Sequence, residues 1–345
     1  MSVIRATFEL EPAGSAEALA IEESTGMPDG PAFVRGHAVV DGDAHGRCVI
    51  ELPASNWGRN VALLVSALVA GEGVETRAFT RCRLVGLELP DGLLPGPAFG
   101  APSLLPGRGA GVGVIFKPSL GLSPAECAAA ADAAARGGAM LVKDDELLGD
   151  PPWCPLEERV RAVASVLHPS VVYCPNVTGP STSLVDRARR VVELGATGVM
   201  VNAFAQGLDA VLALRDAALG VPVFAHRVGS GPLARGERFG ASGAVLASLT
   251  RWCGADFVQV GAYGGKLFDT DDEVDAQLAA ARSPLGTGVL PSVAVLGGGV
   301  SPANAASHAS RAGGDGLLLL LGSAAYVDPR GVTASVRATV ESLQP

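Results

Sequence analysis

The chain has 345 residues and a net charge of −9, and it is 48% hydrophobic but only 5% aromatic. That length suits a barrel of about 250 residues together with one smaller domain. The acidic balance and the lack of a dense Lys/Arg run argue against a nucleic-acid partner, which would require a basic surface. No apolar run approaches the ~18 residues of a membrane span, so we expect no membrane partner. Cysteines without a C-x-x-C pair favour a cytoplasmic protein.

The first part of the chain predicts a small α+β domain over residues 1–95. Alternating residues predict strands, and apolar or acid-led stretches predict helices. The predicted order is β-α-β-β-α-β, the ferredoxin-like arrangement, with elements at 4–10, 15–23, 33–40, 47–52, 60–70 and 81–89. The Gly- and Pro-rich segment that follows predicts a linker at residues 96–110.

Residues 111–345 show a regular alternation that predicts a C-terminal (β/α)₈ TIM barrel. Short apolar runs recur, and helical stretches such as 124–136, 155–168, 184–194 and 302–312 lie between them. A doubly wound open sheet is the alternative, but it would usually carry a glycine-rich fingerprint in its first βα turn. The predicted strands are 113–117, 140–143, 171–175, 198–202, 221–226, 257–261, 293–296 and 316–321.

Active sites of such barrels lie where the strands end, and the second strand ends in Lys143-Asp144-Asp145-Glu146. Asp145 and Glu146 offer the hard oxygen ligands that Mg²⁺ prefers. Lys143 could join them if its desolvated amine took up CO₂ as a carbamate. The alternative is a solvated acidic loop that favours the N-terminus of a helix.

Three further groups follow other strands. Gly297, Gly298 and Gly299 after the seventh strand, with Gly322 and Ser323 after the eighth, fit a backbone phosphate site or plain tight turns. Lys266 lies on a glycine-rich loop that could close over a substrate, or it is simply solvated.

Two strand-end cations could also act on a substrate. Arg227, which follows His226, could clamp a phosphate or pair with a neighbouring carboxylate. Lys117 ends an apolar strand, where desolvation would make it a usable base, or it extends into solvent at the barrel rim.

Together these motifs resemble the RuBisCO large-subunit superfamily. "GVIFKPSLGL" at 113–122 resembles the family's "GTIIKPKLGL", and "GGAMLVKDDE" at 137–146 resembles its "GGxxxxKDDE" activation motif. "GPAFG" at 96–100, His226-Arg227, Gly265-Lys266 and the glycine triplet follow in the family's order. In the small domain, "IEESTG" at 21–26 resembles "AAESSTGTW".

The resemblance implies a role for each matching residue. Lys143 would be the carbamylated lysine, and Asp145 and Glu146 would complete the Mg²⁺ ligands. Lys117 and Lys266 would be catalytic lysines. The residues that would contact substrate are Glu22, Thr25, His226, Arg227, Gln259, Gly297, Gly298, Gly299, Gly322 and Ser323. Because the family shares its active site across a dimer, a homodimer or a higher oligomer of dimers is implied, with Glu22, Thr25 and Glu72 reaching the partner's site.

Departures from the carboxylase pattern point to a RuBisCO-like protein of the form IV type. Ser119 replaces a lysine, Gln259 a histidine, Gly297 a serine and Glu72 an asparagine, while Met27-Pro28 replaces Thr-Trp. The metal ligands and the enolisation lysines are retained.

These departures shape the functions that we expect. The resemblance implies Mg²⁺-dependent enolisation or isomerisation of a phosphorylated ketose-like substrate without CO₂ fixation. The 2,3-diketo-5-methylthiopentyl 1-phosphate enolase of methionine salvage and a methylthioribulose 1-phosphate isomerase are the models. Lys117 or Glu72 would move the proton. The alternatives are a decarboxylase or transcarboxylase of a phosphorylated 3-oxo sugar acid, and a non-catalytic binding or regulatory protein on a degenerate barrel.

Overall fold

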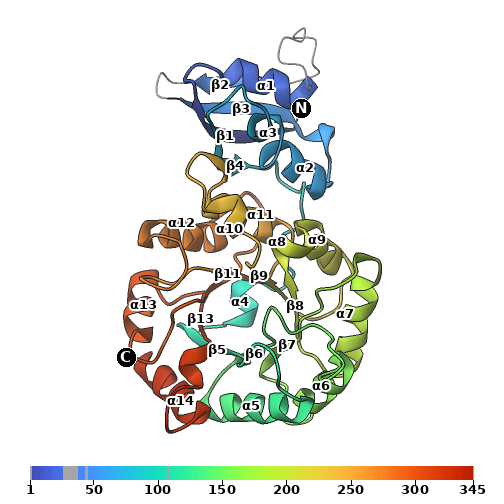
Figure 1. The fold of residues 1–345 in the computed structure, drawn as a ribbon, viewed down its shortest axis with the longest axis vertical. Coiled ribbons are helices and arrows are strands. Elements are labelled where there is room, and N and C mark those ends of the chain that lie inside the picture. The colour runs from blue at the N-terminus through green and yellow to red at the C-terminus, as the bar shows by residue number, and fades with distance from the viewer. Residues whose placement is uncertain (1, 26–37, 43–45, 108, 345) are drawn as a thin grey trace.

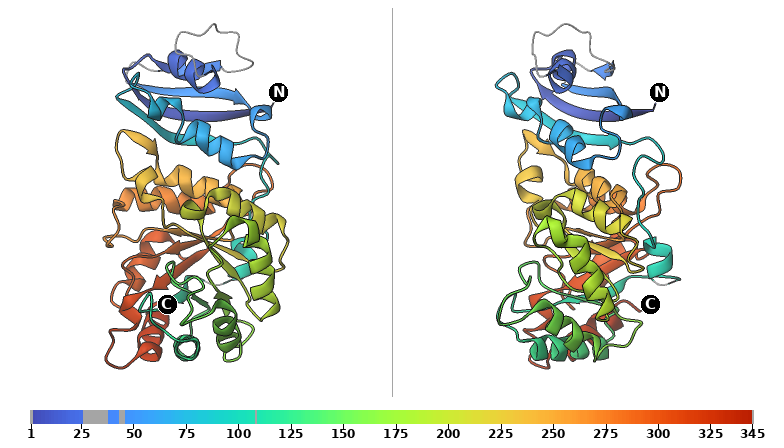
Figure 2. Two further views of the ribbon diagram at one scale, coloured as in Figure 1. Left: turned by 45° about the vertical axis from the view of Figure 1, so that its right-hand side comes forward. Right: turned by 90° about the vertical axis from the view of Figure 1, so that its right-hand side faces the viewer.

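The computed structural model describes residues 2–25, 38–42, 46–107 and 109–344, apart from the side chains of Glu22, Ser24, Thr25 and residues 38–42. It contains a small α+β domain and a barrel, which lie one above the other in Figures 1 and 2. Met27 and Pro28, and most of the predicted strand 33–40, fall outside the described residues. No helix among the described residues is long and apolar enough to cross a membrane.

The small domain has the predicted ferredoxin-like topology, with its own strands in the order β4-β1-β3-β2. Both neighbours of β1 run antiparallel to it. Alternate β1 residues, from Ile4 to Leu10, are buried as expected for a strand with one face on a core. The elements are β1 (Val3–Glu11), α1 (Ala16–Thr25), β2 (Ala38–Gly42), β3 (Arg47–Pro53), α2 (Val61–Leu68), α3 (Glu72–Glu75) and β4 (Arg81–Glu88).

The predicted eight parallel strands of the barrel are confirmed. Seven neighbouring pairs form regular ladders, and β7 and β8 close the ring through a bridge between Asn176 and Met200. The strands are β5 (Gly111–Ile115), β6 (Leu141–Lys143), β7 (Val172–Cys174), β8 (Val199–Asn202), β9 (Val223–His226), β11 (Phe257–Val260), β12 (Val293–Leu296) and β13 (Leu317–Leu321).

The barrel helices begin and end at residues that the sequence marks clearly. α5 (Pro124–Gly137) opens with a capping box between Ser123 and Glu126 and ends at Gly138, whose φ is 99°. α12 opens with a second capping box, formed by Thr270 and Glu273. The other helices are α6 (Leu156–Ala164), α7 (Leu184–Glu193), α8 (Ala203–Gln206), α9 (Leu208–Asp216), α10 (Gly231–Ala234), α11 (Gly243–Trp252), α12 (Asp271–Arg282), α13 (Ala305–Ala312) and α14 (Val332–Ser342).

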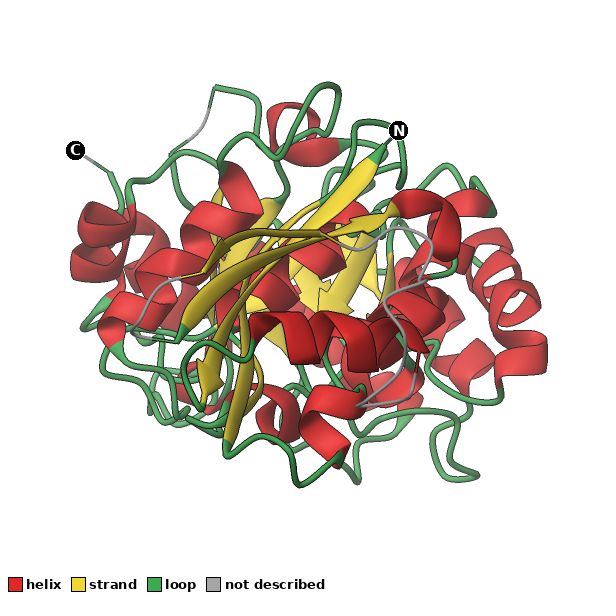
Figure 3. Cartoon of the chain, turned by 90° about the horizontal axis from the view of Figure 1, so that it is seen from above, coloured by secondary structure: helices red, strands yellow, loops and turns green. Residues whose placement is uncertain are grey.

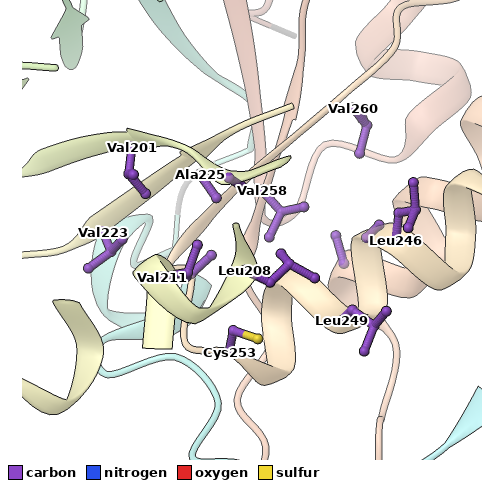
Figure 4. Packing of buried hydrophobic residues seen from close by; sticks show 14 of the residues in the cluster. Val201, Leu208, Val211, Val223, Ala225, Leu246, Leu249, Cys253, Val258 and Val260 are labelled. Carbon is purple, nitrogen blue, oxygen red and sulfur yellow. The ribbon is translucent and has the colours of Figure 1, made fainter. Parts of the chain in front are cut away.

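The barrel strands are buried on both faces, which explains their continuous apolar sequences. Inward-facing side chains such as Met200, Phe224 and Phe257 fill the barrel interior. Outward-facing side chains pack against the helices. Figure 4 shows this outer layer, where strand residues Val201, Val223, Ala225, Val258 and Val260 lie beside helix residues Leu208, Val211, Leu246 and Leu249 and beside Cys253, which follows α11.

Several short elements were not predicted, and two of them contact a neighbouring part of the fold in an unexpected way. β10 (Phe239–Ala241) belongs to the barrel half of the chain but pairs in parallel with β4, so it adds a fifth strand to the small domain's sheet. That sheet therefore lies across the barrel helices, as Figure 3 shows. Within the predicted linker, α4 (Gly100–Leu104) places Ala101 and Leu105 against the barrel interior. The domain boundaries at residues 95 and 110 stay a prediction.

Candidate active site

Strand alternation directs a ring of polar residues into the mouth of the barrel. Because side chains alternate along a strand, residues two positions beyond an interior residue also face inward. This places Lys117, Lys143, Asp145, Asn176, Asn202, His226, Gln259, Gly297 and Gly322 on the inner side. A cavity of about 560 Å³ opens there, and its lining includes Lys117, Glu146, His226, Arg227, Gln259, Lys266, Gly298, Gly299, Gly322 and Ser323.

Lys143 is fully buried at the end of β6. Its Nζ donates to the carbonyl oxygen of Asp144 at 2.7 Å and lies 5.5 Å from the centre of the Phe224 ring. Burial lowers the pKa of Lys143 from 10.5 to about 8, although the carboxylates of Glu146, Asp145 and Asp144 oppose the shift. The neutral amine is therefore much more populated near neutral pH than in an ordinary lysine, although the ammonium still predominates below about pH 8.

Asp144 faces away from the barrel interior and has a structural role. Both of its carboxylate oxygens are used, by Arg159 on α6 at 2.9–3.0 Å and by the Tyr173 hydroxyl at 3.1 Å. Both partners are buried, and the backbone N–H of Asn176 also donates to Asp144. Within the acidic run, alternation thus separates Asp144 from the inward-facing Asp145.

Asp145 pairs with Lys117 across adjacent strand ends. The Lys117 Nζ lies 2.5 Å from Asp145 Oδ2 and donates to Ser119 Oγ at 2.9 Å. Burial raises the pKa of Asp145, but hydrogen bonds from Lys117 and from the Leu147 backbone outweigh it, so the pKa is lowered. Asp145 is therefore an ionised carboxylate, and the Lys117 ammonium that pairs with it must lose a proton before it can act as a base.

Glu146 presents a carboxylate oxygen to the cavity. Its Oε2 is buried and has no hydrogen-bond partner among the described residues. The His226 Nε2 lies 3.5 Å away. Burial, together with the charges of Lys143, Arg227 and Lys117, lowers the pKa of His226 well below 6.5, so the imidazole is neutral. Its Nδ1 accepts from the Val228 backbone N–H, which leaves the proton on Nε2, facing Glu146.

Two asparagines hold the backbone of this acidic loop. Asn202 Nδ2 donates to the Glu146 carbonyl oxygen at 2.9 Å, and Asn176 Nδ2 donates to the same oxygen at 3.1 Å. Asn202 Oδ1 is buried without a partner in the described chain. The sequence gave no reason to assign this positioning role to either asparagine.

The donors around Lys143 are compatible with a magnesium site. Asp145 and Glu146 supply oxygens, and Glu146 Oε2 has an unmet hydrogen-bonding capacity. No group of three His, Cys, Asp or Glu side chains that could hold a metal occurs among the described residues. A third anionic ligand would therefore have to come from elsewhere, and a carbamate on Lys143 would provide it.

The glycine loops pack directly against the loop that carries Lys266. The Lys266 backbone N–H donates to the Gly298 carbonyl oxygen at 2.8 Å. At Gly299, where φ is 155°, a Cβ would come within 2.8 Å of the Gly265 Cα, so only glycine permits this approach. The Lys266 side chain is exposed and lines the cavity, whereas Gly297 is buried beside Gln259 and is not among the lining residues.

Arg227 is paired with a carboxylate, as the alternative interpretation of the sequence allowed. Its guanidinium bonds both oxygens of Asp269, at 2.7 and 3.1 Å. Its assignment as a phosphate ligand stays a prediction. The sequence did not identify Asp269, because 42 residues separate it from Arg227.

The small-domain residues lie apart from this cavity. All described lining residues of the cavity belong to the barrel. Glu72 begins α3 and is exposed, whereas Glu22 and Thr25 lie in α1 with side chains outside the described part. Their predicted contact with a substrate therefore requires a second chain. The sequence did not identify Ser230, Ser301 and Phe268, which also line the cavity.

A second cavity, of about 680 Å³, lies at the opposite end of the barrel, beside α4 and α12. This second cavity is larger, but the ring of polar residues described above lies at the other end of the barrel. Its lining arginine, Arg282, is already bonded to the carbonyl oxygens of Ala312, Gly313 and Asp315. We therefore place the candidate active site at the C-terminal mouth.

Comparisons with known sequences and structures point to one family. The model of the ribulose bisphosphate carboxylase large chain catalytic domain matches residues 102–283. A ribulose bisphosphate carboxylase-like protein of Allochromatium vinosum is 36% identical over 269 residues, 73% of this chain and 58% of that protein. The crystal structure of a rubisco-like protein from Burkholderia fungorum has a TM-score of 0.86 at 25% identity and covers 100% of this chain and 96% of that one.

Two relatives carry names that specify a reaction. The 3-oxo-isoapionate-4-phosphate transcarboxylase/hydrolase of Xanthobacter autotrophicus is 32% identical over 84% of this chain and 74% of that protein. The 2,3-diketo-5-methylthiopentyl-1-phosphate enolase of Geobacillus kaustophilus is 37% identical over 51% of this chain and 46% of that protein. The chain spans 58–66% of the length of the first curated relatives that it matches. By the matched catalytic domain and these identities, the chain belongs to the ribulose bisphosphate carboxylase large-chain family, among its RuBisCO-like proteins.

Proposed function

We propose that this protein is a Mg²⁺-dependent enolase or isomerase of a phosphorylated ketose-like substrate, acting as a shared-site homodimer. The observation that carries the proposal is the buried Lys143, with a pKa of about 8, next to Asp145 and the unpartnered Glu146 oxygen. A surface or structural lysine has no need for such an environment, since burying an amine is costly.

Lys143 as a carbamate, Asp145 and Glu146 would hold the metal. Bound there, Mg²⁺ would act as a Lewis acid toward a substrate carbonyl oxygen. The neutral His226 can donate a hydrogen bond from Nε2 into the cavity. Gln259 Oε1, which is buried without a partner in the described chain, can accept one from a substrate hydroxyl.

The remaining site residues would bind the phosphate and move the proton. Lys266 and the backbone N–H groups near Gly298, Gly299 and Gly322 line one side of the cavity and suit a phosphate. Lys117 lies at the cavity wall, and it can accept the proton that enolisation removes once it has left Asp145 and lost its own ammonium proton. Glu72 of a partner chain is the second candidate for this base.

Hydrogen exchange tests the proposal directly. With Mg²⁺ and bicarbonate, the protein should catalyse exchange of a carbon-bound hydrogen of 2,3-diketo-5-methylthiopentyl 1-phosphate with D₂O, followed by proton NMR. Glu146→Gln should lose this activity, while Glu158→Gln, at an exposed position of α6, should keep it. A substrate panel of phosphorylated ketoses, all without exchange, would contradict the proposal and favour a non-catalytic binding protein.

A transcarboxylase or decarboxylase of a phosphorylated 3-oxo sugar acid is the second candidate. Its support is the relative of that name, whose alignment covers more of both chains than the enolase alignment does. Both reactions need a stabilised enolate. Release of labelled CO₂ from a 3-oxo acid phosphate distinguishes the two.

Asp145→Ala should weaken Mg²⁺ binding strongly, because it removes one of the two protein carboxylates at the site, the one whose pKa is lowered. We expect at least a tenfold loss, of the size typical for loss of a metal-site interaction. Isothermal titration with Mg²⁺ in bicarbonate buffer measures it. Unchanged affinity would place the metal elsewhere.

Ribulose bisphosphate should not be carboxylated. Ser119 and Gln259 replace a lysine and a histidine of carboxylases, and Ser119 here only accepts a hydrogen bond from Lys117. Labelled CO₂ fixation by pure protein is the measurement. Fixation above a no-protein control would overturn this expectation.

Activation by CO₂ should increase with pH through about 8. Below that value Lys143 is mostly protonated and cannot attack CO₂, and above it the neutral amine predominates, since burial lowers its pKa. The measurement is the activation rate at fixed dissolved CO₂ and saturating Mg²⁺. A midpoint close to 10.5, the ordinary lysine value, would show that Lys143 is not the activated amine.

A further inference from the structure

The environment of Arg227 differs from that of the other cations at the barrel mouth. It follows the inward-facing His226, so alternation turns it outward, toward the start of α12. There Asp269 holds its guanidinium by two hydrogen bonds, and Gln277 Oε1 accepts a third at 3.3 Å. Gln277 Nε2 also donates to Asp269 Oδ1 at 2.7 Å, which fixes the carboxylate.

This pair is almost completely shielded from water. The side chains of Arg227 and Asp269 are 10% and 2% exposed. The Asp269 carboxylate accepts hydrogen bonds from the two guanidinium nitrogens that would otherwise be available to bind a phosphate. Breaking the pair would leave a buried carboxylate without its counter-ion, which is strongly unfavourable. Arg227 is therefore a poor site for an additional anion.

The part of the cavity around Lys266 and the glycine loops has a different charge balance. Lys266 lines the cavity and has no carboxylate within ion-pair distance in the described chain. The glycine loops beside it add backbone N–H donors. Near Arg227, in contrast, the wall includes Phe268, whose ring centre lies 5.4 Å from the guanidinium carbon, and Ser230.

We propose that Asp269 is a specificity-determining residue that cancels the Arg227 anion site and restricts the substrate to one phosphate. The phosphate binds at the Lys266 and glycine-loop side. The other end of the substrate is uncharged and lies against Phe268 and Ser230. This inference rests on the proposed function in so far as it takes the bound molecule to be a substrate. The preference of the cavity for one or two phosphates can be measured without any reaction.

Two unreactive probes separate the sites. Pentane-1,5-diol monophosphate and pentane-1,5-diol bisphosphate have no carbonyl group, so their binding does not depend on enolisation, and titration without Mg²⁺ removes any contribution of the metal. Isothermal titration of the full-length protein should show that the bisphosphate binds no more tightly than the monophosphate, apart from the statistical factor of about two for two equivalent ends. A bisphosphate preference of about tenfold or more in the unmodified protein would overturn the proposal.

Asp269→Asn should create the second anion site. The amide can still bond Arg227 and Gln277, but the arginine charge is no longer compensated, so bisphosphate affinity should increase by about tenfold or more relative to monophosphate. Asp272→Asn is the matched control, because it removes an exposed charge three residues away. It should leave the ratio unchanged.

A double variant assigns the gain to Arg227. In Arg227→Gln/Asp269→Asn the bisphosphate preference should disappear again. A folded Asp269→Asn protein with the original ratio, or a gain that persists in the double variant, would overturn the proposal. If Asp269→Asn does not fold, the ratio in the unmodified protein still decides. If the affinity ratios are as expected but the hydrogen-exchange assay shows no activity, the proposed reaction is contradicted and this inference is not.

Discussion

Lys143→Met should abolish the Mg²⁺- and bicarbonate-dependent activity, with a loss on the order of 10³-fold or more. A metal contributes several kcal/mol to transition-state stabilisation, and about 4 kcal/mol corresponds to that factor. Methionine preserves most of the side-chain volume but has no amine that could react with CO₂. The measurement is the exchange rate with saturating substrate, Mg²⁺ and bicarbonate.

The loss should not come from unfolding. Lys143 is fully buried, and among the described residues its Nζ donates to the carbonyl oxygen of Asp144 alone. Replacing a buried amine by an apolar thioether removes a desolvation cost, so the melting temperature should stay the same or rise. Carbon-13 NMR with labelled bicarbonate should show a carbamate signal in the unmodified protein and none in the variant. An active, carbamate-free variant would contradict the assigned role of Lys143.

The fold could be predicted because its signals are local. Each barrel strand is a short apolar run. Helices such as α5 begin and end at capping residues, which can be recognised from a few neighbouring positions in the sequence. The active-site ring follows from the same pattern. Once β6 is placed, alternation alone separates the inward-facing Lys143 and Asp145 from Asp144, although the sequence did not reveal that Arg159 would hold Asp144.

The features that were missed depend on tertiary contacts. β10 has only three residues and becomes a strand because the edge of β4 lies next to it. The partner of Arg227 could not be chosen from the sequence, since several carboxylates follow the sixth barrel strand and only packing brings Asp269 to it. The position of Glu72 relative to a barrel likewise depends on the assembly, which one chain does not contain.

Mixing two inactive variants should restore activity if the active site is shared between chains. Glu72→Gln alters the small domain, whereas Asp145→Ala alters the barrel, so a mixed dimer has one site with both lesions and one with neither. Random exchange makes about half of the dimers mixed, so about a quarter of the normal sites should work. Activity against mixing ratio should peak at equal amounts. Each single variant must first be shown to be inactive.

The rim of the barrel mouth exposes apolar side chains, as expected if a partner chain covers it. Strands β13, β5 and β6 are neighbours, and the loops after them expose Val327, Leu120, Leu147 and Trp153 by 76, 50, 62 and 45%. Large apolar side chains gathered at one rim are typical of an interface. As a matched control, Asp145→Ala mixed with Lys143→Met should stay inactive, because both lesions lie in barrels and every site then carries one. Confirmed mixed dimers without activity in the first pair, or a fully active monomer in sedimentation, would contradict the shared site.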